Sequence, residues 1–435
     1  MDLEADGRFG NKRVHNRLGP APGAASSSTS GKVCHHWRAG RCNRFPCPYL
    51  HSELPEASAI SMRPNQRDGP GGGGHVWRNP SSGGGGGRSG GGSNRWGRGP
   101  GGANGGVRDK VPDRPCKFFL SGDCKYGEKC RYLHTYCMSN SITLLTPLQG
   151  HEKVVTGIAL PTGSDKLYSG SKDGTVRLWD CQTGQCACVL KVGGEVGCMI
   201  SEGPWLFVGI PDAVKVWNMQ TQAEMNLTGP TGQVYALAIG NELLFAATQD
   251  GRILAWRFSA VTNCFEPAAS LEGHQLAVVS LIVGGMRLYS GSMDKTIRVW
   301  DLATLQCIQT LSDHTSVVMS LLCWDQFLLS CSLDQTIKVW AATESGNLEV
   351  TYTHKEENGV LALTGMPDAQ SKPVLVCSLN DNTVRLYDLP SFSDRGRIFA
   401  KQEIRAIQSG PGLFFTGDGT GELKVWQWVI DASQT

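Results

Sequence analysis

The sequence contains no long apolar run. Nowhere in its 435 residues does it reach the roughly 18 uninterrupted apolar positions that a membrane-spanning helix needs. The first twenty residues, MDLEADGRFGNKRVHNRLGP, also lack the apolar core of a secretory signal. These absences predict a soluble, intracellular protein with no membrane partner.

Motifs of several common enzyme sites are absent as well. The sequence has no GxxxxGK[ST] phosphate loop and no HExxH zinc-protease motif. It also offers no recognition helix or basic region suited to the major groove of DNA. We therefore expect a protein that is not an enzyme, and we rank double-stranded DNA low among its ligands.

A strong overall charge is missing too, but the charges are unevenly placed. The formal net charge is only +2, from 41 Lys and Arg and 39 Asp and Glu. Residues 1–140 hold 21 basic against 10 acidic residues, whereas residues 141–435 hold 20 against 29. A basic arm on a mildly acidic body predicts a polyanionic partner for the arm.

Two stretches are of low complexity. Residues 69–106 contain 19 glycines in 38 positions, with Arg and Trp scattered among them, and residues 20–31 read PAPGAASSSTSG. Such compositions cannot bury enough apolar surface to offset the entropy lost on ordering. We expect both stretches to be disordered and the glycine-rich one to act as a flexible linker.

Six of the sixteen cysteines fall into two short clusters. Residues 34–51 read CHHWRAGRCNRFPCPYLH and residues 116–134 read CKFFLSGDCKYGEKCRYLH. Three thiolates and one imidazole form a closed tetrahedral zinc site, with no open position for a catalytic water. Because segments this short have almost no core, a structural ion is expected to fold each one. The predicted ligands of these two Zn²⁺ ions are Cys34, Cys42, Cys47 and His51 in the first cluster, and Cys116, Cys124, Cys130 and His134 in the second.

The remaining ten cysteines form no comparable cluster and are expected to be buried thiols.

From about residue 142 the sequence repeats itself. The segments VRLWD, VKVWN, ILAWR, IRVWD, IKVWA, VRLYD and LKVWQ follow one another at intervals of 38 to 47 residues. This spacing is typical of a four-stranded propeller blade, and radial stacking of such small sheets buries their apolar faces. The predicted fold is all-β, a seven-bladed propeller preceded by two zinc-stabilised segments and a disordered Gly-rich linker. The strand at 141–147 is expected to close the ring as the outer strand of the last blade.

The repeats resemble the WD-repeat family. In three repeats that resemblance implies that a His, an Asp and a Trp join a strand serine in a buried hydrogen-bond network. A His, Asp and Ser set could also suggest a hydrolase, but its recurrence in three blades favours a structural network. The implied residues are His151, Asp173 and Trp179, then His274, Asp294 and Trp300, then His314, Asp334 and Trp340.

The two cysteine clusters resemble CCCH zinc fingers, a family that mostly binds single-stranded RNA. The resemblance implies base stacking on Tyr126 and Tyr132 in the second finger, and on Phe45 and Tyr49 in the first, where Phe45 sits one place later in its gap. Stacking contributes about 1 to 3 kcal/mol per base. Phosphate contacts, which make binding salt-dependent, are expected from Lys117, Lys125, Lys129 and Arg131.

The whole arrangement resembles the plant CCCH-type zinc-finger proteins with WD repeats. We expect a disordered arm over 1–31, finger 1 over 32–53, a Gly/Arg-rich linker over 54–113, finger 2 over 114–136 and a propeller over 141–435. The resemblance implies a nucleic-acid-binding protein whose propeller recruits other proteins. We expect it to be a nuclear or nucleocytoplasmic monomer that binds single-stranded RNA in preference to DNA and docks a protein on its propeller. The alternative is a protein-interaction scaffold, such as a ubiquitin-ligase substrate receptor, whose fingers contact proteins. DNA binding by the fingers ranks lower.

Overall fold

The structure is a computed structural model that describes residues 114–161, 164–410 and 412–429. Finger 1 and the Gly/Arg-rich linker lie outside the described residues, so the assignments made for them stay predictions. The affected site residues are Cys34, Cys42, Phe45, Cys47, Tyr49 and His51. No helix in the described part of the chain is long and apolar enough to cross a membrane.

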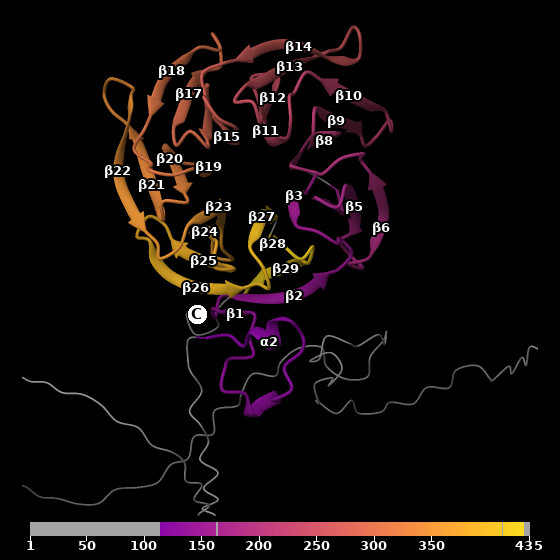
Figure 1. The fold of residues 1–435 in the computed structure, drawn as a ribbon, viewed down its shortest axis with the longest axis vertical. Coiled ribbons are helices and arrows are strands. Elements are labelled where there is room, and N and C mark those ends of the chain that lie inside the picture. The colour runs from indigo at the N-terminus through magenta and orange to yellow at the C-terminus, as the bar shows by residue number, and fades with distance from the viewer. Residues whose placement is uncertain (1–113, 162–163, 411, 430–435) are drawn as a thin grey trace, which may run out of the picture. The chain divides into compact units, whose positions relative to one another are not determined.

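Seven antiparallel sheets are arranged radially around one axis (Figure 1), which confirms the predicted seven-bladed propeller. Each of the first six blades is built from four strands that follow one another along the chain. Blade one has β3 (Val155–Ala159), β4 (Lys166–Ser171), β5 (Thr175–Asp180) and β6 (Cys186–Lys191); blade two has β7 (Cys198–Glu202), β8 (Trp205–Ile210), β9 (Ala213–Asn218) and β10 (Glu224–Thr228); blade three has β11 (Val234–Gly240), β12 (Leu243–Thr248), β13 (Ile253–Ser259) and β14 (Cys264–Leu271).

The second half of the ring continues in the same way. Blade four has β15 (Val278–Gly284), β16 (Arg287–Ser292), β17 (Ile297–Asp301) and β18 (Cys307–Leu311); blade five has β19 (Val318–Trp324), β20 (Phe327–Ser332), β21 (Thr336–Ala342) and β22 (Leu348–Lys355); blade six has β23 (Val360–Pro367), β24 (Pro373–Leu379), β25 (Thr383–Asp388) and β26 (Ser393–Phe399); blade seven has β27 (Ile404–Gly410), β28 (Leu413–Asp418), β29 (Leu423–Trp428) and, from the other end of the domain, β2 (Ile142–Leu148).

Strand β2 closes the ring. It pairs antiparallel with β29, from Ile142 opposite Trp428 to Leu148 opposite Leu423, and so completes blade seven. This pairing confirms the closure expected from the sequence. Because the two ends of the domain share one sheet, neither end can leave without exposing the edge of blade seven.

The apolar core lies between neighbouring blades. One cluster joins Ala247 of blade three to Leu288 and Trp300 of blade four, and similar clusters lie between the other neighbouring blades. The inner strands are apolar on both faces because each packs against a blade on either side. Seven small sheets that could not fold alone thereby share one continuous core.

The hydrogen-bond networks implied for blades one, four and five are present. In blade one His151 Nδ1 lies 2.9 Å from Asp173 Oδ2, and its Nε2 lies 2.8 Å from Ser169 Oγ. The Trp179 indole N–H donates to the same hydroxyl over 2.7 Å. Blades four and five repeat this arrangement through Ser290 and Ser330. All three serines are fully buried. In each of these blades the hydrogen bonds of the histidine connect a loop to the strand that carries the serine.

Blade six builds a different network at the same positions. Glu356 precedes Val360 by four residues, just as His151 precedes Val155 in blade one. The Tyr387 hydroxyl donates to Glu356 Oε1 over 2.5 Å, and Arg385 Nε lies 3.7 Å from Oε2. Burial opposes ionisation of Glu356, but these partners and a neighbouring histidine hold its pKa below its usual value. A glutamate and a tyrosine therefore replace the histidine and the tryptophan.

Most of the ten non-cluster cysteines are not buried, and the prediction for them was wrong in that respect. Only Cys198, Cys331 and Cys377 are buried, while Cys181 and Cys188 are exposed. Cys181 lies in the turn between β5 and β6, and Cys188 lies on β6, the outer strand of blade one. This outer strand has a free edge and an open face, so its side chains reach solvent.

The stability of the propeller is expected to fall on acidification in two stages. Burial lowers the pKa of His151 and His314, so below about pH 6.5 the unfolded chain binds protons that the folded chain does not. Burial opposes ionisation of Asp173 and Asp334, but hydrogen bonds outweigh it and lower the pKa of both carboxyls. Their contribution is present above about pH 4 and is lost as pH falls through the folded pKa.

The measurement is the urea midpoint of tryptophan fluorescence at several pH values. A decrease between about pH 7.5 and 5.5 that becomes shallower in the His151→Gln variant supports this account. A midpoint that rises on acidification in that range contradicts it.

Candidate zinc centre and nucleic-acid interface

Finger 2 is held closed where its two ends meet. The Cys116 backbone N–H donates to the Leu133 carbonyl over 2.8 Å, and Leu133 N–H donates to Arg114 O over 3.0 Å. Between these ends lie a one-turn helix, α2 (Lys117–Leu120), and a 3-10 turn, η1 (Gly127–Lys129). Gly122 reverses the chain after α2 with a φ of +84°, a left-handed conformation that favours glycine.

The fold of finger 2 brings together the four predicted ligands of this segment. Cys116, Cys124, Cys130 and His134 offer ligand atoms that all lie within 4.8 Å of one another. Zn–S bonds of about 2.3 Å in a tetrahedron separate the sulfurs by about 3.8 Å. The sulfurs of Cys116 and Cys130 are 3.6 Å apart, so the cluster fits a zinc ion. Zinc there would be a structural ion, because four protein ligands leave no open position.

The electrostatics around the cysteines differ between the core and the rim of the finger. Burial raises the pKa of the Cys116 thiol. Cys124 is less enclosed, and hydrogen bonds from the Tyr126 backbone N–H and the neighbouring thiols outweigh desolvation and lower the pKa of its thiol. A bound Zn²⁺ would hold all three cysteines as thiolates.

The rings and cations proposed for RNA contact surround this centre on the surface. Tyr126 is 70% exposed and Tyr132 is 44% exposed. Large exposed aromatic side chains in so small a unit are available to stack on a ligand. The four predicted phosphate contacts, Lys117, Lys125, Lys129 and Arg131, are also exposed.

A third exposed ring was missed in the sequence. Phe118 is 65% exposed, whereas its neighbour Phe119 stacks on His134 with ring centroids 4.7 Å apart. The one-turn helix α2 has the sequence KFFL, and only one of its two adjacent phenylalanine rings can face the zinc centre. Two adjacent phenylalanines in so short a helix therefore indicate that the other ring lies on the surface.

Finger 2 is joined to the propeller through Tyr136. The ring of Phe119 lies 5.0 Å from that of Tyr136, which in turn packs against the apolar cluster of blades six and seven. Phe399 N–H donates to the Tyr136 carbonyl over 2.9 Å. Strand β1 (Cys137–Met138) then adds to β26 as a fifth strand of blade six (Figure 1). Through these contacts finger 2 lies against the ring.

Two family models match the chain. The WD domain, G-beta repeat, matches residues 142–180, 265–301 and 305–341, and the CCCH-type zinc finger matches residues 114–134. The matched repeats are blades that carry the full histidine network, together with the closing strand β2.

Curated plant proteins are similar over their whole lengths. Zinc finger CCCH domain-containing protein 17 of Oryza sativa subsp. japonica is 86% identical, with 100% of both chains covered. Zinc finger CCCH domain-containing protein 48 of Arabidopsis thaliana is 61% identical, over 100% of this chain and 99% of that protein.

Among solved structures, the crystal structure of the WD40 beta propeller domain of Doa1 matches with a TM-score of 0.58 and 21% identity. The match covers 68% of this chain and 99% of that chain. At this identity the likeness concerns the fold.

Proposed function

This chain belongs to the CCCH zinc-finger proteins that carry a WD-repeat propeller, and on that premise we propose that it binds single-stranded RNA through its fingers while the propeller docks a protein. The observation that carries the RNA assignment is the pairing of exposed rings and cations around the ligand cluster of finger 2. In this proposal the protein acts as a monomer in the nucleus or in both nucleus and cytoplasm.

The physical basis is a small platform that the zinc ion keeps in shape. Every base has a π face, so exposed tyrosines bind unpaired bases with little sequence preference, and Lys and Arg add salt-dependent phosphate contacts. Four exposed cations around one finger supply those contacts. Finger 1 would add a second site of the same kind and raise the affinity for longer strands.

The direct test is fluorescence anisotropy of the full-length, zinc-loaded protein against labelled single-stranded RNA and matched DNA homopolymers. Binding that favours RNA, weakens with salt and is lost on chelation supports the proposal. Equal binding to DNA would favour the lower-ranked DNA function. No binding to either would favour the scaffold, in which the fingers contact proteins.

Removing both rings is expected to weaken RNA binding without removing zinc. The double variant Tyr126→Ala, Tyr132→Ala should lose about 2 to 6 kcal/mol of binding free energy, because two stacked bases each contribute about 1 to 3 kcal/mol. Both rings are exposed and neither supplies a zinc ligand, so the zinc content should stay unchanged. An RNA affinity equal to that of the parent protein would refute the stacking account.

The propeller offers an exposed apolar surface for a protein. Met293 directly precedes Asp294, and Leu333 directly precedes Asp334, the aspartates of the histidine networks in blades four and five. Leu276 lies close to Met293, because the Met293 N–H donates to the carbonyl of the adjacent Ala277. These three side chains, here called the blade 4–5 patch, are 54% (Leu276), 38% (Met293) and 37% (Leu333) exposed. Because Met293 and Leu333 occupy equivalent positions in neighbouring blades, both lie on the same rim of the ring, where exposed apolar side chains can contact a protein.

Replacing the blade 4–5 patch with serines is expected to remove a protein partner. Pull-downs from ribonuclease-treated plant extract compare the parent, the triple variant Leu276→Ser, Met293→Ser, Leu333→Ser and the control Val261→Ser. Val261 is 96% exposed in the turn between β13 and β14, so the control removes exposed apolar surface elsewhere. A protein lost only from the triple variant supports docking there, whereas identical partner sets would count against it.

A further inference from the structure

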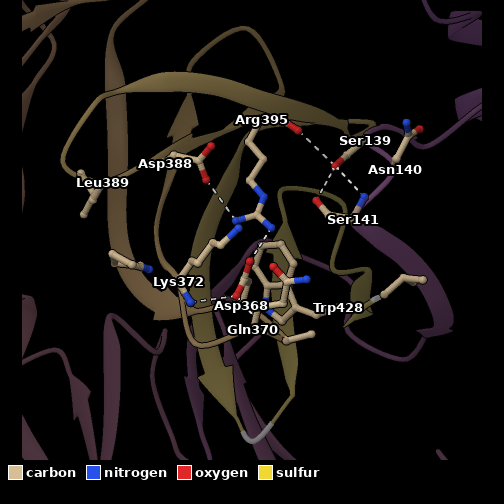
Figure 2. A pocket seen from close by; sticks show the side chains of 13 residues that line it. Ser139, Asn140, Ser141, Asp368, Gln370, Lys372, Asp388, Leu389, Arg395 and Trp428 are labelled. Carbon is tan, nitrogen blue, oxygen red and sulfur yellow. Dashed lines mark hydrogen bonds and ion pairs between the residues drawn. The ribbon is translucent and has the colours of Figure 1, made fainter. Parts of the chain in front are cut away.

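A polar cavity lies where blades six and seven meet the chain that leaves finger 2. Its volume is about 410 Å³. Figure 2 shows the four segments that line it, namely the connection before β2, the turn between β23 and β24, the outer part of blade six and the end of β29. We call it the interblade cavity; its lining includes Asn140, Asp368, Gln370, Lys372, Arg395 and Trp428.

Arg395 forms a fixed, flat cation on the wall of the interblade cavity. Its Nη2 lies 2.5 Å from Asp368 Oδ2 and its Nη1 lies 3.1 Å from Asp388 Oδ1. Its guanidinium carbon lies 5.2 Å from the centre of the Trp428 ring, so one face of the guanidinium is covered (Figure 2). The Asp368 side chain is 2% exposed, which keeps this ion pair in place. A guanidinium held by two carboxylates and an indole needs no further ordering to accept a flat ligand.

The other polar groups around the cavity are both donors and acceptors. Asn140, Gln370 and Lys372 have exposed side chains, and Asp388 is 41% exposed. Arg395 and Lys372 balance Asp368 and Asp388, so the lining as a whole carries little net charge. A neutral, planar group with its own donors and acceptors suits such a lining better than a free anion does.

We propose that the interblade cavity is a nucleoside pocket that accepts one unpaired base of the RNA strand held by finger 2. The base stacks on the open face of Arg395, and its edge hydrogen-bonds with Gln370 and Asn140. Lys372 contacts the adjoining phosphate. Unpaired bases are commonly read in this way, by stacking on an aromatic or guanidinium plane and by hydrogen bonds to their edges. This inference rests on the proposed RNA-binding function.

The position of the cavity allows one strand to reach both sites. Only four residues lie between the predicted zinc ligand His134 and Ser139 on the cavity wall, and the five residue steps span at most about 18 Å. The contacts of Tyr136 and the pairing of β1 with β26 fix this connection on blade six. A strand of several nucleotides can therefore occupy finger and cavity together, and a very short one cannot.

The test measures the affinity of the full-length protein for RNA of about 4 and about 12 nucleotides. The variant Gln370→Ala, Lys372→Ala should lose about ten- to a hundredfold in affinity for the longer RNA, through two lost hydrogen bonds, and little for the shorter one. Lys172→Ala is the charge-matched control, because it removes an exposed lysine from the turn after β4 in blade one. In addition, RNA carrying 4-thiouridine should crosslink to residues 368–373 or 139–141.

The outcomes separate this inference from the function on which it rests. If the tyrosine variant of finger 2 loses RNA affinity while the cavity variant binds like Lys172→Ala and no crosslink reaches the cavity, the nucleoside pocket is refuted and RNA binding stands. If the parent protein binds no RNA at all, both fail. If the cavity variant loses only a protein partner, the cavity serves proteins and the nucleoside assignment is overturned.

Discussion

Replacing Cys124 by serine is expected to unfold finger 2 and to remove one zinc ion per chain. Zinc-finger peptides gain about 10 to 16 kcal/mol of apparent free energy from their ion, and so short a segment has no core that could substitute for it. Cys124 is one of the four ligand residues whose donor atoms lie within 4.8 Å of each other. RNA affinity should fall at least as far as in the double tyrosine variant, because the platform is lost together with its rings.

The measurement is the zinc content of the purified full-length protein, followed by RNA anisotropy. Cys188→Ser is a matched control, since it makes the same change at an exposed cysteine of β6. The control should keep the zinc content and affinity of the parent. Zinc content unchanged by Cys124→Ser would contradict the ligand assignment.

The propeller should survive the loss of finger 2. Its ring is closed by β2 and β29, which begin after the finger and its connection. Unfolding of finger 2 would remove the packing of Phe119 against Tyr136 and would weaken the pairing of β1 with β26. We therefore expect the fluorescence midpoint of the propeller in Cys124→Ser to stay close to that of the parent.

The seven-bladed ring could be predicted because its repeats are periodic in the sequence. The zinc ligands of finger 2 could be predicted because they lie close together in the sequence. A tryptophan or tyrosine recurs once per blade, and each such residue packs against the preceding blade, so its spacing counts the blades. The four ligands of finger 2 lie within nineteen residues, in the segment 116–134, where spacing alone determines which side chains can meet.

The features that were missed depend on contacts between distant segments. The interblade cavity joins residues near 140, 370, 395 and 428, and no local pattern brings these together. Blade six has Glu356 at the position of the histidine, and no local pattern in its sequence indicates a network there. The structure shows that Glu356, Tyr387 and Arg385 form one, a substitution that is visible only once the strands are aligned in space.

Removing His314 is expected to destabilise the propeller more than removal of an exposed side chain would. His314 Nδ1 lies 2.8 Å from Asp334 Oδ2 and its Nε2 lies 2.8 Å from Ser330 Oγ. In His314→Ala the carboxylate of Asp334, only 7% exposed, loses its histidine partner and keeps the hydrogen bonds from Thr315 and Thr336. The Ser330 hydroxyl also loses the ring nitrogen that accepts its proton. Because burial lowers the pKa of His314, its ring is neutral at neutral pH, and losing its hydrogen bond to the buried carboxylate costs about 1.5 to 3 kcal/mol of unfolding free energy.

A double-mutant cycle separates the lost hydrogen bond from the lost packing. Because Asp334→Ala in the His314→Ala background removes the carboxylate that has lost its histidine, the double variant should be less destabilised than the sum of the two single variants. Urea unfolding followed by tryptophan fluorescence gives all four free energies. Strict additivity would mean that the two side chains act independently. A coupling of about 1 to 3 kcal/mol would instead identify the network as one unit that ties the loop before β19 to the turn between β20 and β21.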